Sequence, residues 1–329
     1  MFRWISRALV LLLLLGCAGW FGANYILSKP YRGFEGDKLI DIERGSGSRQ
    51  IAKQLTDAGV IQNEWYFLTA RAMHPRTALQ AGEYQFEKPA SVLEVYDRLR
   101  RGDIYTFDFT VPEGSNLWDI ARLLELHGVM KEGDFLKAAS DPAIIADIAP
   151  EAESLEGYLF PATYRLTHKT TAKELCRMMV EQFKKQWKAL GGQGAPHPVL
   201  TLASLVEEET GVPSERAIVA GVFSNRLQKG MTLACDPTVV YAALLEGKYR
   251  GTIHKSDLER RHPYNTYLNN GLPPGPITNP GKASIDAAMH PAQTDALYFV
   301  ARADGPGHVF SSTAAAHIRA VQSYRAKAN

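Results

Sequence analysis

Residues 202–242 read LASLVEEETGVPSERAIVAGVFSNRLQKGMTLACDPTVVYA and carry two predicted helices with a short break between them. The first helix, predicted over 199–210, is apolar until its last turn. The second, predicted over 214–229, has Ser214 as its N-cap and stops before Gly230, and these residue types are preferred at such positions. Three consecutive acidic residues therefore fall at the end of the first helix.

The acidic triplet Glu207, Glu208 and Glu209 lies where the helix dipole disfavours negative charge, and crowding of like charges adds to the cost. Helical spacing puts Glu207 and Glu209 on the side of the apolar residues, and Glu208 towards water. An acid in apolar surroundings has a raised pKa, which suits a general acid working near neutral pH. A solvated helix end is the alternative interpretation, so the chemistry alone does not select Glu207.

The chain from residue 150 to residue 329 predicts a larger α+β domain. An aromatic stretch, LEGYLFPATYRL at 155–166, precedes a predicted helix over 171–190. Residues 262–281, HPYNTYLNNGLPPGPITNPG, hold too much Pro, Gly and Asn for regular structure, and long ordered loops are usually functional. The end of the chain predicts a strand, a turn, a second strand and a helix.

An internal repeat precedes this domain. Residues 42–46, IERGS, align with residues 111–115, VPEGS, and Gly59 aligns with Gly128 without a gap. Each copy predicts a short strand, a Gly-Ser turn, a helix that ends at the glycine, and a second helix.

Residues 78–109 lie between the copies, with strand-like alternation around a helix that Ser91 can cap. We expect 36–140 to form one or two small α+β units. A strand followed by two helices, opened by a PEGS-like turn, resembles the LysM-type carbohydrate-binding module. The first copy has GSGS at 45–48, where that module usually has Gly-Asp or Gly-Glu. A small structural domain without a ligand is the alternative.

The N-terminal segment predicts a membrane anchor. Residues 8–28 carry no charge and have the length that spans a bilayer. The arginines within residues 1–7 place this short tail in the cytoplasm by the positive-inside rule. A cleaved signal peptide is one alternative. A lipoprotein signal ending at Cys17 is another, because LLGC resembles a lipobox; however, the apolar run continues to Leu27, as only a spanning helix requires.

Composition excludes several classes of function. The net charge is only +2 and no basic run occurs, so nucleic-acid binding is not expected. The three cysteines have neither the number nor the spacing of a disulfide scaffold or a zinc site. There is no HExxH pair, no glycine-rich phosphate loop and no GxSxG elbow. We therefore predict no metal and no cofactor.

The stretch quoted first, with YNTYLNNGLPPGPITNPG at 264–281 and YFVARADGPGHVF at 298–310, resembles the endolytic murein transglycosylase family, the MltG or YceG-like proteins. The similarity covers the anchor, the LysM-like part and the domain at 150–329. It implies an α+β fold and a lytic transglycosylase activity. This reaction breaks the β-1,4 bond between N-acetylmuramic acid and N-acetylglucosamine without water and leaves a 1,6-anhydro muramyl end.

The family motif A-S-hydrophobic-V-E-x-E implies that Glu207 is catalytic and that Glu209 supports the site. Because the sugar's own C6 hydroxyl attacks, one carboxyl can act first as acid and then as base, whereas ordinary glycosidases need two. The family's EGYLFPDTY reads EGYLFPATY here, so Ala162 replaces the usual aspartate. Further candidates for substrate binding or support, with structural roles equally open for the first two, are Asn225, Asp236, Tyr264, Asn265, Thr266, Tyr267 and Glu156.

The resemblance also implies a single-pass protein of the inner, cytoplasmic membrane with its catalytic domain in the periplasm. Its partners would be peptidoglycan glycan strands, with wall synthases as candidate protein partners, and its role the ending of nascent strands. Two other readings of the same residues are a non-enzymatic peptidoglycan-binding scaffold and a hydrolytic muramidase.

Overall fold

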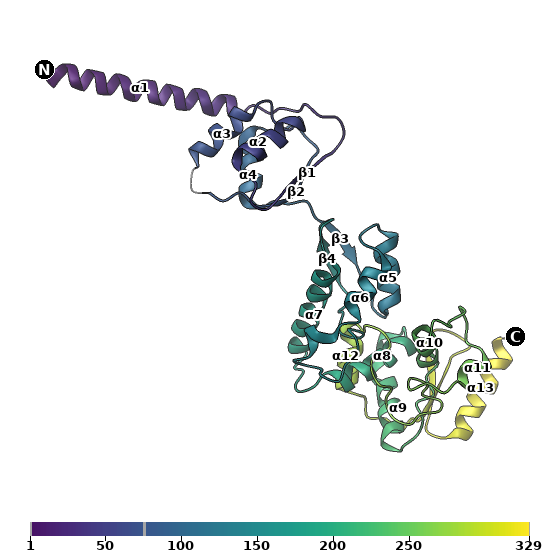
Figure 1. Cartoon of the computed structure of the whole chain (residues 1–329). Helices are drawn as coiled ribbons and strands as arrows, with labels where there is room; N and C mark the ends of the chain where they lie inside the picture. The colour runs from purple at the N-terminus through teal and green to yellow at the C-terminus, as the bar shows by residue number, and fades with distance from the viewer. Residues whose placement is uncertain (1, 75–76, 329) are drawn as a thin grey trace. The chain divides into compact units, whose positions relative to one another are not determined.

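The computed structural model describes residues 2–74 and 77–328, and the chain divides into two compact units at Phe107 and Asp108 (Figure 1). The predicted mixed α+β class is confirmed: the chain is mostly helical, with small two-stranded sheets. The first unit contains α1 (Phe2–Leu27), β1 (Lys38–Ile42), α2 (Ser48–Asp57), α3 (Glu64–Met73), β2 (Gly82–Phe86) and α4 (Val92–Arg101).

The second unit is larger. Its helices and strands are β3 (Phe107–Thr110), α5 (Leu117–Leu126), α6 (Glu132–Ala139), η1 (Pro142–Ile145), β4 (Thr163–Leu166), α7 (Ala172–Ala189), α8 (His197–Glu209), η2 (Pro213–Glu215), α9 (Arg216–Gln228), α10 (Asp236–Leu245), α11 (Lys255–Leu258), α12 (Lys282–Met289), β5 (Tyr298–Ala301), β6 (His308–Ser311) and α13 (Ala314–Ala328).

The helix α1 is long and apolar enough to cross a membrane. Its segment Val10–Leu27 has a mean hydropathy of 1.9 and is almost entirely exposed. An N-terminal signal sequence would have the same length and composition, so the helix fits either a single-pass anchor or such a signal.

The first unit is a small sheet with helices α2, α3 and α4 packed on it. Strands β1 and β2 pair antiparallel, from Lys38 opposite Phe86 to Ile42 opposite Gly82. Alternate residues of both strands point into a core that also takes the apolar faces of the three helices. The largest fully buried side chains in this core are Leu27, Leu55, Ile61, Phe67, Tyr84, Phe86 and Leu99.

The two copies of the internal repeat fold alike, each as a strand followed by two helices. The first copy, β1-α2-α3, belongs to the first unit, and the second, β3-α5-α6, belongs to the second unit. Strand β3 pairs with β4 rather than with a strand of the first unit. The region predicted at 36–140 therefore contributes to both units.

Helix α8 lies at the centre of the second unit. Every residue from Leu200 to Val206 is buried, because α9, α10 and α12 all pack on it. A helix that is apolar on all sides must be enclosed in this way. Its last turn carries the acidic triplet, so the packing of its neighbours determines what surrounds these acids.

The predicted N-cap Ser214 is wrong. Pro213 starts the 3-10 turn η2, and Ser214 lies inside this turn. Helix α9 begins at Arg216, with Glu215 as an N-cap that makes no side-chain capping bond. A proline fixes φ near −65° and is favoured at the first position of a helix, which moves the start of the turn ahead of the serine.

The helix that Ser91 was predicted to cap is confirmed as α4. The Ser91 hydroxyl accepts from the Glu94 amide (3.2 Å), and the Glu94 carboxylate accepts from the Ser91 amide (2.7 Å). We predict that Ser91→Ala destabilises α4 by about 1 kcal/mol, because the Glu94 amide loses its acceptor. Hydrogen exchange of the α4 amides in the detergent-solubilised chain measures the effect. The matched control is Ser48→Ala in α2, where Gly47 is the N-cap and makes no side-chain bond. Equal protection in both variants would contradict the prediction.

Candidate functional site

The Glu207 carboxyl is held from two sides at the end of α8. Its Oε2 accepts a hydrogen bond from the Gly281 amide (2.8 Å), at the start of α12. Its Oε1 lies 3.5 Å from Nη2 of Arg216, the first residue of α9. The Glu207 side chain is only 7% exposed and that of Arg216 13%. The carboxyl is thus fixed in orientation by groups from two other helices.

These contacts differ from the apolar pocket that the helical spacing predicts for Glu207. The apolar face of α8 does lead to this residue, but the last turn meets a guanidinium and a backbone amide. Spacing along one helix identifies the direction of a side chain, whereas the groups it meets come from segments distant in sequence. Arg216 was not among the predicted site residues, although it stands in the same quoted stretch.

The neighbouring Glu208 is exposed to solvent, as predicted, although protein atoms also lie around its carboxyl. Burial, followed by the carboxylates of Asp119, Glu207 and Glu209, raises the pKa of Glu208 to about 7. Glu208 also borders a cavity of about 290 Å³. A carboxyl that titrates near neutral pH beside a cavity is typical of functional sites.

The third acid, Glu209, faces inward, as its spacing predicts. Burial raises its pKa, while a hydrogen bond with the Cys235 thiol and the charges of His308 and Arg226 oppose the rise. Arg226 in turn donates to the carbonyls of Leu297 (2.7 Å) and Leu233 (2.6 Å). Glu209 therefore belongs to a network that joins α8 to the segments before β5 and α10.

The Gly-Ser turn of the second repeat copy lies against the triplet. A methyl group at Gly114, which has φ of 77°, would come within 3.3 Å of a Glu208 carboxyl oxygen and 3.6 Å of Glu207 Cγ. A methyl group at Gly281 would collide with the Glu113 carboxyl. The turn thus brings a fourth carboxyl, Glu113, to the glycine whose amide binds Glu207.

Asn279 fastens this turn in place. Its amide donates to the carbonyl of Ser115 (2.9 Å) and to Glu156 (2.9 Å), and its side-chain oxygen accepts from the Leu159 amide (2.9 Å). Its backbone bonds to Ser115 and Gly114 as well. Asn279 is completely buried. The sequence identifies Asn279 only as part of the polar loop at 262–281, because its partners lie in distant segments.

Glu156, also a candidate for substrate binding or support, is buried. Its carboxyl accepts from the Leu117 amide (3.1 Å) as well as from Asn279, and Tyr241 bonds to it too. Burial raises the pKa of Glu156 well above its usual range, and these donors oppose the rise. Its contacts connect the start of α5 to the 277–281 segment, so Glu156 stabilises the segments that surround the site.

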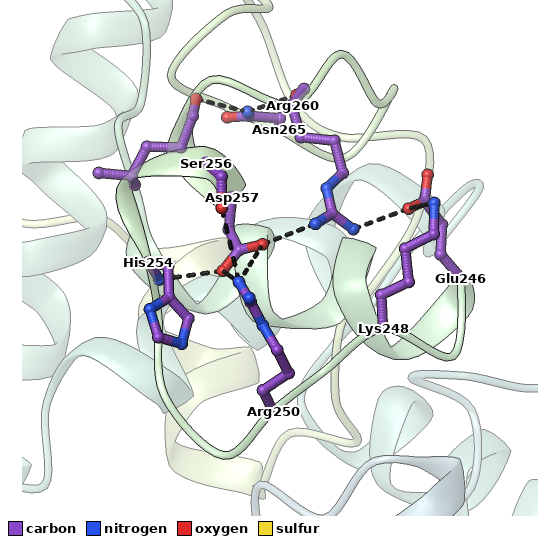
Figure 2. Close-up of polar contacts among 9 residues, drawn as sticks. Glu246, Lys248, Arg250, His254, Ser256, Asp257, Arg260 and Asn265 are labelled. Carbon is purple, nitrogen blue, oxygen red and sulfur yellow. Dashed lines mark hydrogen bonds and ion pairs between the residues drawn. The ribbon is translucent and has the colours of Figure 1, made fainter.

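The four loop candidates at 264–267 divide into two groups. Asn265 and Thr266 are buried, and their polar atoms bind the protein: Asn265 donates to the carbonyls of Leu258 and Arg260, as Figure 2 shows, and Thr266 accepts from the Cys235 amide. Tyr264 and Tyr267 lie nearer the surface. The Tyr264 ring packs 5.0 Å from that of Tyr241, and the Tyr267 hydroxyl donates to Asp236.

Asn225 and Asp236, the remaining candidates, both make contacts within the protein. Asn225 on α9 donates to the carbonyls of Thr294 (2.8 Å) and Ala296 (3.0 Å). Asp236 starts α10, accepts from Tyr267, and borders the same cavity as Glu208. Among the described residues, 2–74 and 77–328, no three His, Cys, Asp or Glu side chains gather as metal ligands do.

Comparison with known proteins decides the family. The sequence profile of the YceG-like family matches residues 40–323. The chain belongs to the YceG-like family.

Named relatives agree with this assignment. The endolytic murein transglycosylase of Bacillus subtilis (strain 168) is 35% identical over 313 residues, which cover 88% of this chain and 85% of that protein. The endolytic murein transglycosylase of Streptococcus pneumoniae (serotype 2, strain D39) is 31% identical over 338 residues, which cover 89% of this chain and 60% of that longer protein.

A solved structure is similar too. The crystal structure of the yceG-like protein lmo1499 from Listeria monocytogenes superimposes with a TM-score of 0.56 at 32% identity, covering 87% of this chain and 99% of that one. The YceG-like match spans both units, so the acidic triplet and the Gly-Ser turn that meets it lie within one family region.

The raised pKa of Glu208 in this YceG-like site has a measurable consequence. A carboxyl whose folded pKa lies above its unfolded value contributes stability that is complete below the unfolded pKa and is lost as pH rises through the folded pKa. The window for Glu208 therefore runs from about pH 4.5 to about pH 7. We predict that Glu208→Gln equals the parent below this window and is more stable above it, by about 1 kcal/mol after allowance for solvent screening.

Thermal unfolding of the detergent-solubilised chain between about pH 4 and pH 9 tests this prediction. Glu181→Gln, at an exposed acid of α7, is the control and should show no such pH-dependent gain. A Glu208→Gln variant that follows the parent at every pH would contradict the assigned shift.

Proposed function

We propose that this YceG-like chain is an endolytic murein transglycosylase that cuts peptidoglycan glycan strands. The bond cleaved is the β-1,4 link from N-acetylmuramic acid to the next N-acetylglucosamine, and the product carries a 1,6-anhydro muramyl end. The observation that carries the proposal is the Glu207 carboxyl, fixed between Gly281 and Arg216 at the end of a buried helix. The names of the two curated relatives support it.

In the proposed reaction one carboxyl serves twice. Protonated Glu207 gives its proton to the glycosidic oxygen, and the bond from that oxygen to C1 of the muramyl sugar breaks. The C6 hydroxyl of the same sugar then bonds to C1, and its proton returns to the Glu207 carboxylate. No water is consumed, and the intramolecular nucleophile carries an entropic advantage.

The supporting residues hold this carboxyl and the turn beside it. Arg216 contacts one oxygen, and the Gly281 amide, set by Asn279 two residues earlier, contacts the other. Glu209 and Glu156 support the site from the inside through their own networks. Tyr264, Tyr267, Asp236 and Asn225 remain proposed as substrate-binding or supporting residues.

The proposed location is the inner membrane, with residues 1–7 in the cytoplasm and α1 as a single-pass anchor. The apolar segment Val10–Leu27 supports this placement, as do the arginines before it. The rest of the chain would then face the periplasm, where peptidoglycan strands are its substrate and wall synthases candidate partners. Ending nascent strands near the membrane is the role that fits this location.

We predict that Glu207→Gln lowers the release of anhydro-muropeptides from purified peptidoglycan by about 10³-fold, because the amide cannot donate the proton. Mass spectrometry of the products measures the effect, with Glu181→Gln as the control. Products with reducing ends, heavier by one water, would indicate a hydrolytic muramidase. Binding of peptidoglycan without any release by the parent chain would indicate a scaffold.

Arg216 is a positioning residue in this proposal. We predict that Arg216→Met lowers kcat by about 10²-fold, because the Glu207 carboxyl loses one of its two fixed contacts, with little change in KM. Arg216→Lys should recover part of the loss, since it keeps the charge but not the planar fork. A merely structural role would instead leave kcat per folded molecule unchanged in both variants and lower only the yield of folded chain.

A further inference from the structure

A cavity lies beside Glu208, and the proposed reaction assigns no role to most of the residues that line it. Its volume is about 290 Å³, and it lies along α10. Val240 and Leu244 of α10 form one wall, and Ile253 another. Glu208 and Tyr249 border it, and Tyr249 is 41% exposed. The lining therefore combines apolar side chains with polar ones, which also include Asn116, Asp236 and Tyr241.

One polar atom in this lining has no protein partner. Thr278 is 4% exposed, and its Oγ1 is buried without a hydrogen bond to any described residue. A buried hydroxyl without a partner costs about 1–3 kcal/mol. The backbone on either side is fixed, because the Ile277 amide donates to Ser204 (3.1 Å) and Asn279 is bonded as described. Thr278 thus places an unpaired hydroxyl at a fixed position in the cavity lining.

The segment that carries Tyr249 and Ile253 is held by a network of charges, drawn in Figure 2. Asp257 is its centre: the carboxylate accepts from the His254 amide (2.9 Å) and pairs with Arg250 (3.2 Å) and Arg260 (2.7 Å). The His254 amide and these arginines lower the pKa of Asp257. Arg260 also bonds to Glu246 (2.8 Å), at the end of α10. The part of the lining formed by Tyr249 and Ile253 is therefore preorganised.

We propose that this cavity binds the N-acetyl group of an amino sugar in the glycan strand. The apolar side chains accept the methyl group, the Thr278 hydroxyl donates to the acetyl carbonyl, and Tyr249 contacts the sugar ring at the rim. An N-acetyl group combines one methyl with one strong acceptor, which matches apolar side chains that lie beside the unpaired Thr278 hydroxyl. The charged peptide stems of peptidoglycan match it less well.

The inference rests on the proposed function, because the cavity is adjacent to the acidic triplet that would cut the strand. A pocket of this size takes one sugar unit rather than a long strand. By binding one acetylated sugar beside Glu208, the cavity would fix the position of the strand along the site. The neighbouring glycosidic bond would then lie at Glu207. Sugars without the acetyl group would leave Thr278 without a partner.

Binding to the full-length chain in detergent tests the inference independently of catalysis. The Glu207→Gln chain is titrated with the β-1,4 tetramer of N-acetylglucosamine and with the β-1,4 tetramer of glucose, which has the same linkage and no acetamido group. We predict that the Glu207→Gln chain binds the acetylated tetramer more tightly. Adding Thr278→Val should weaken that binding by about tenfold and leave the glucose tetramer unchanged, because valine keeps the shape and removes one hydrogen bond.

Two further variants complete the experiment. Ser284→Ala also removes a buried hydroxyl that has no partner among the described residues, but outside the cavity, and should bind both tetramers as the parent does. Val240→Trp fills the cavity and should weaken binding of the acetylated tetramer even if Thr278→Val folds poorly.

The inference is overturned if the acetylated tetramer does not bind, if the two tetramers bind equally, or if Thr278→Val and Ser284→Ala behave alike. A chain that selects the acetylated tetramer through Thr278 but releases no anhydro products would refute the proposed function and leave the binding site. The reverse result, with anhydro products but no effect of Thr278, would refute only the binding site.

Discussion

The geometry of the site depends on the hydrogen bonds of one buried amide, Asn279. Its side chain and backbone together bind Gly114 and Ser115 in one segment of the second unit and Glu156 and Leu159 in another. These bonds hold the Gly-Ser turn against the segment that places the Gly281 amide opposite Glu207. A buried polar group raises the free energy of the folded state unless its hydrogen bonds are made. The segments that Asn279 connects are therefore held in the one arrangement that satisfies these bonds.

Because of these Asn279 hydrogen bonds, the second repeat copy has a different structural role from the first. Both copies fold as a strand and two helices, and both turns carry a glycine with positive φ. The first copy packs within its own unit, whereas in the second copy β3 pairs with β4 and the turn meets the acids. The second copy thus forms one wall of the candidate site.

The local elements could be predicted from the sequence because their signals are local. Ser91 caps its helix as expected, the helix predicted over 171–190 forms as α7, and the end of the chain forms β5, β6 and α13. Glu207 followed from spacing and resemblance. Arg216, Glu113 and Asn279 did not, since their roles come from contacts across large sequence separations. Ser214 failed for a local reason, because Pro213 starts its own turn.

Three acids in a row at a helix C-terminus would repel one another and the helix dipole if all were charged. The structure reduces this cost differently for each acid. Glu207 meets a backbone amide and a guanidinium, Glu209 lies near Arg226 and His308, and burial leaves Glu208 with a pKa of about 7. Since Glu208 is only partly ionised at neutral pH, the triplet holds fewer than three charges there. Environments that separate the protonation of adjacent carboxyls are the usual means by which one site provides different chemical roles.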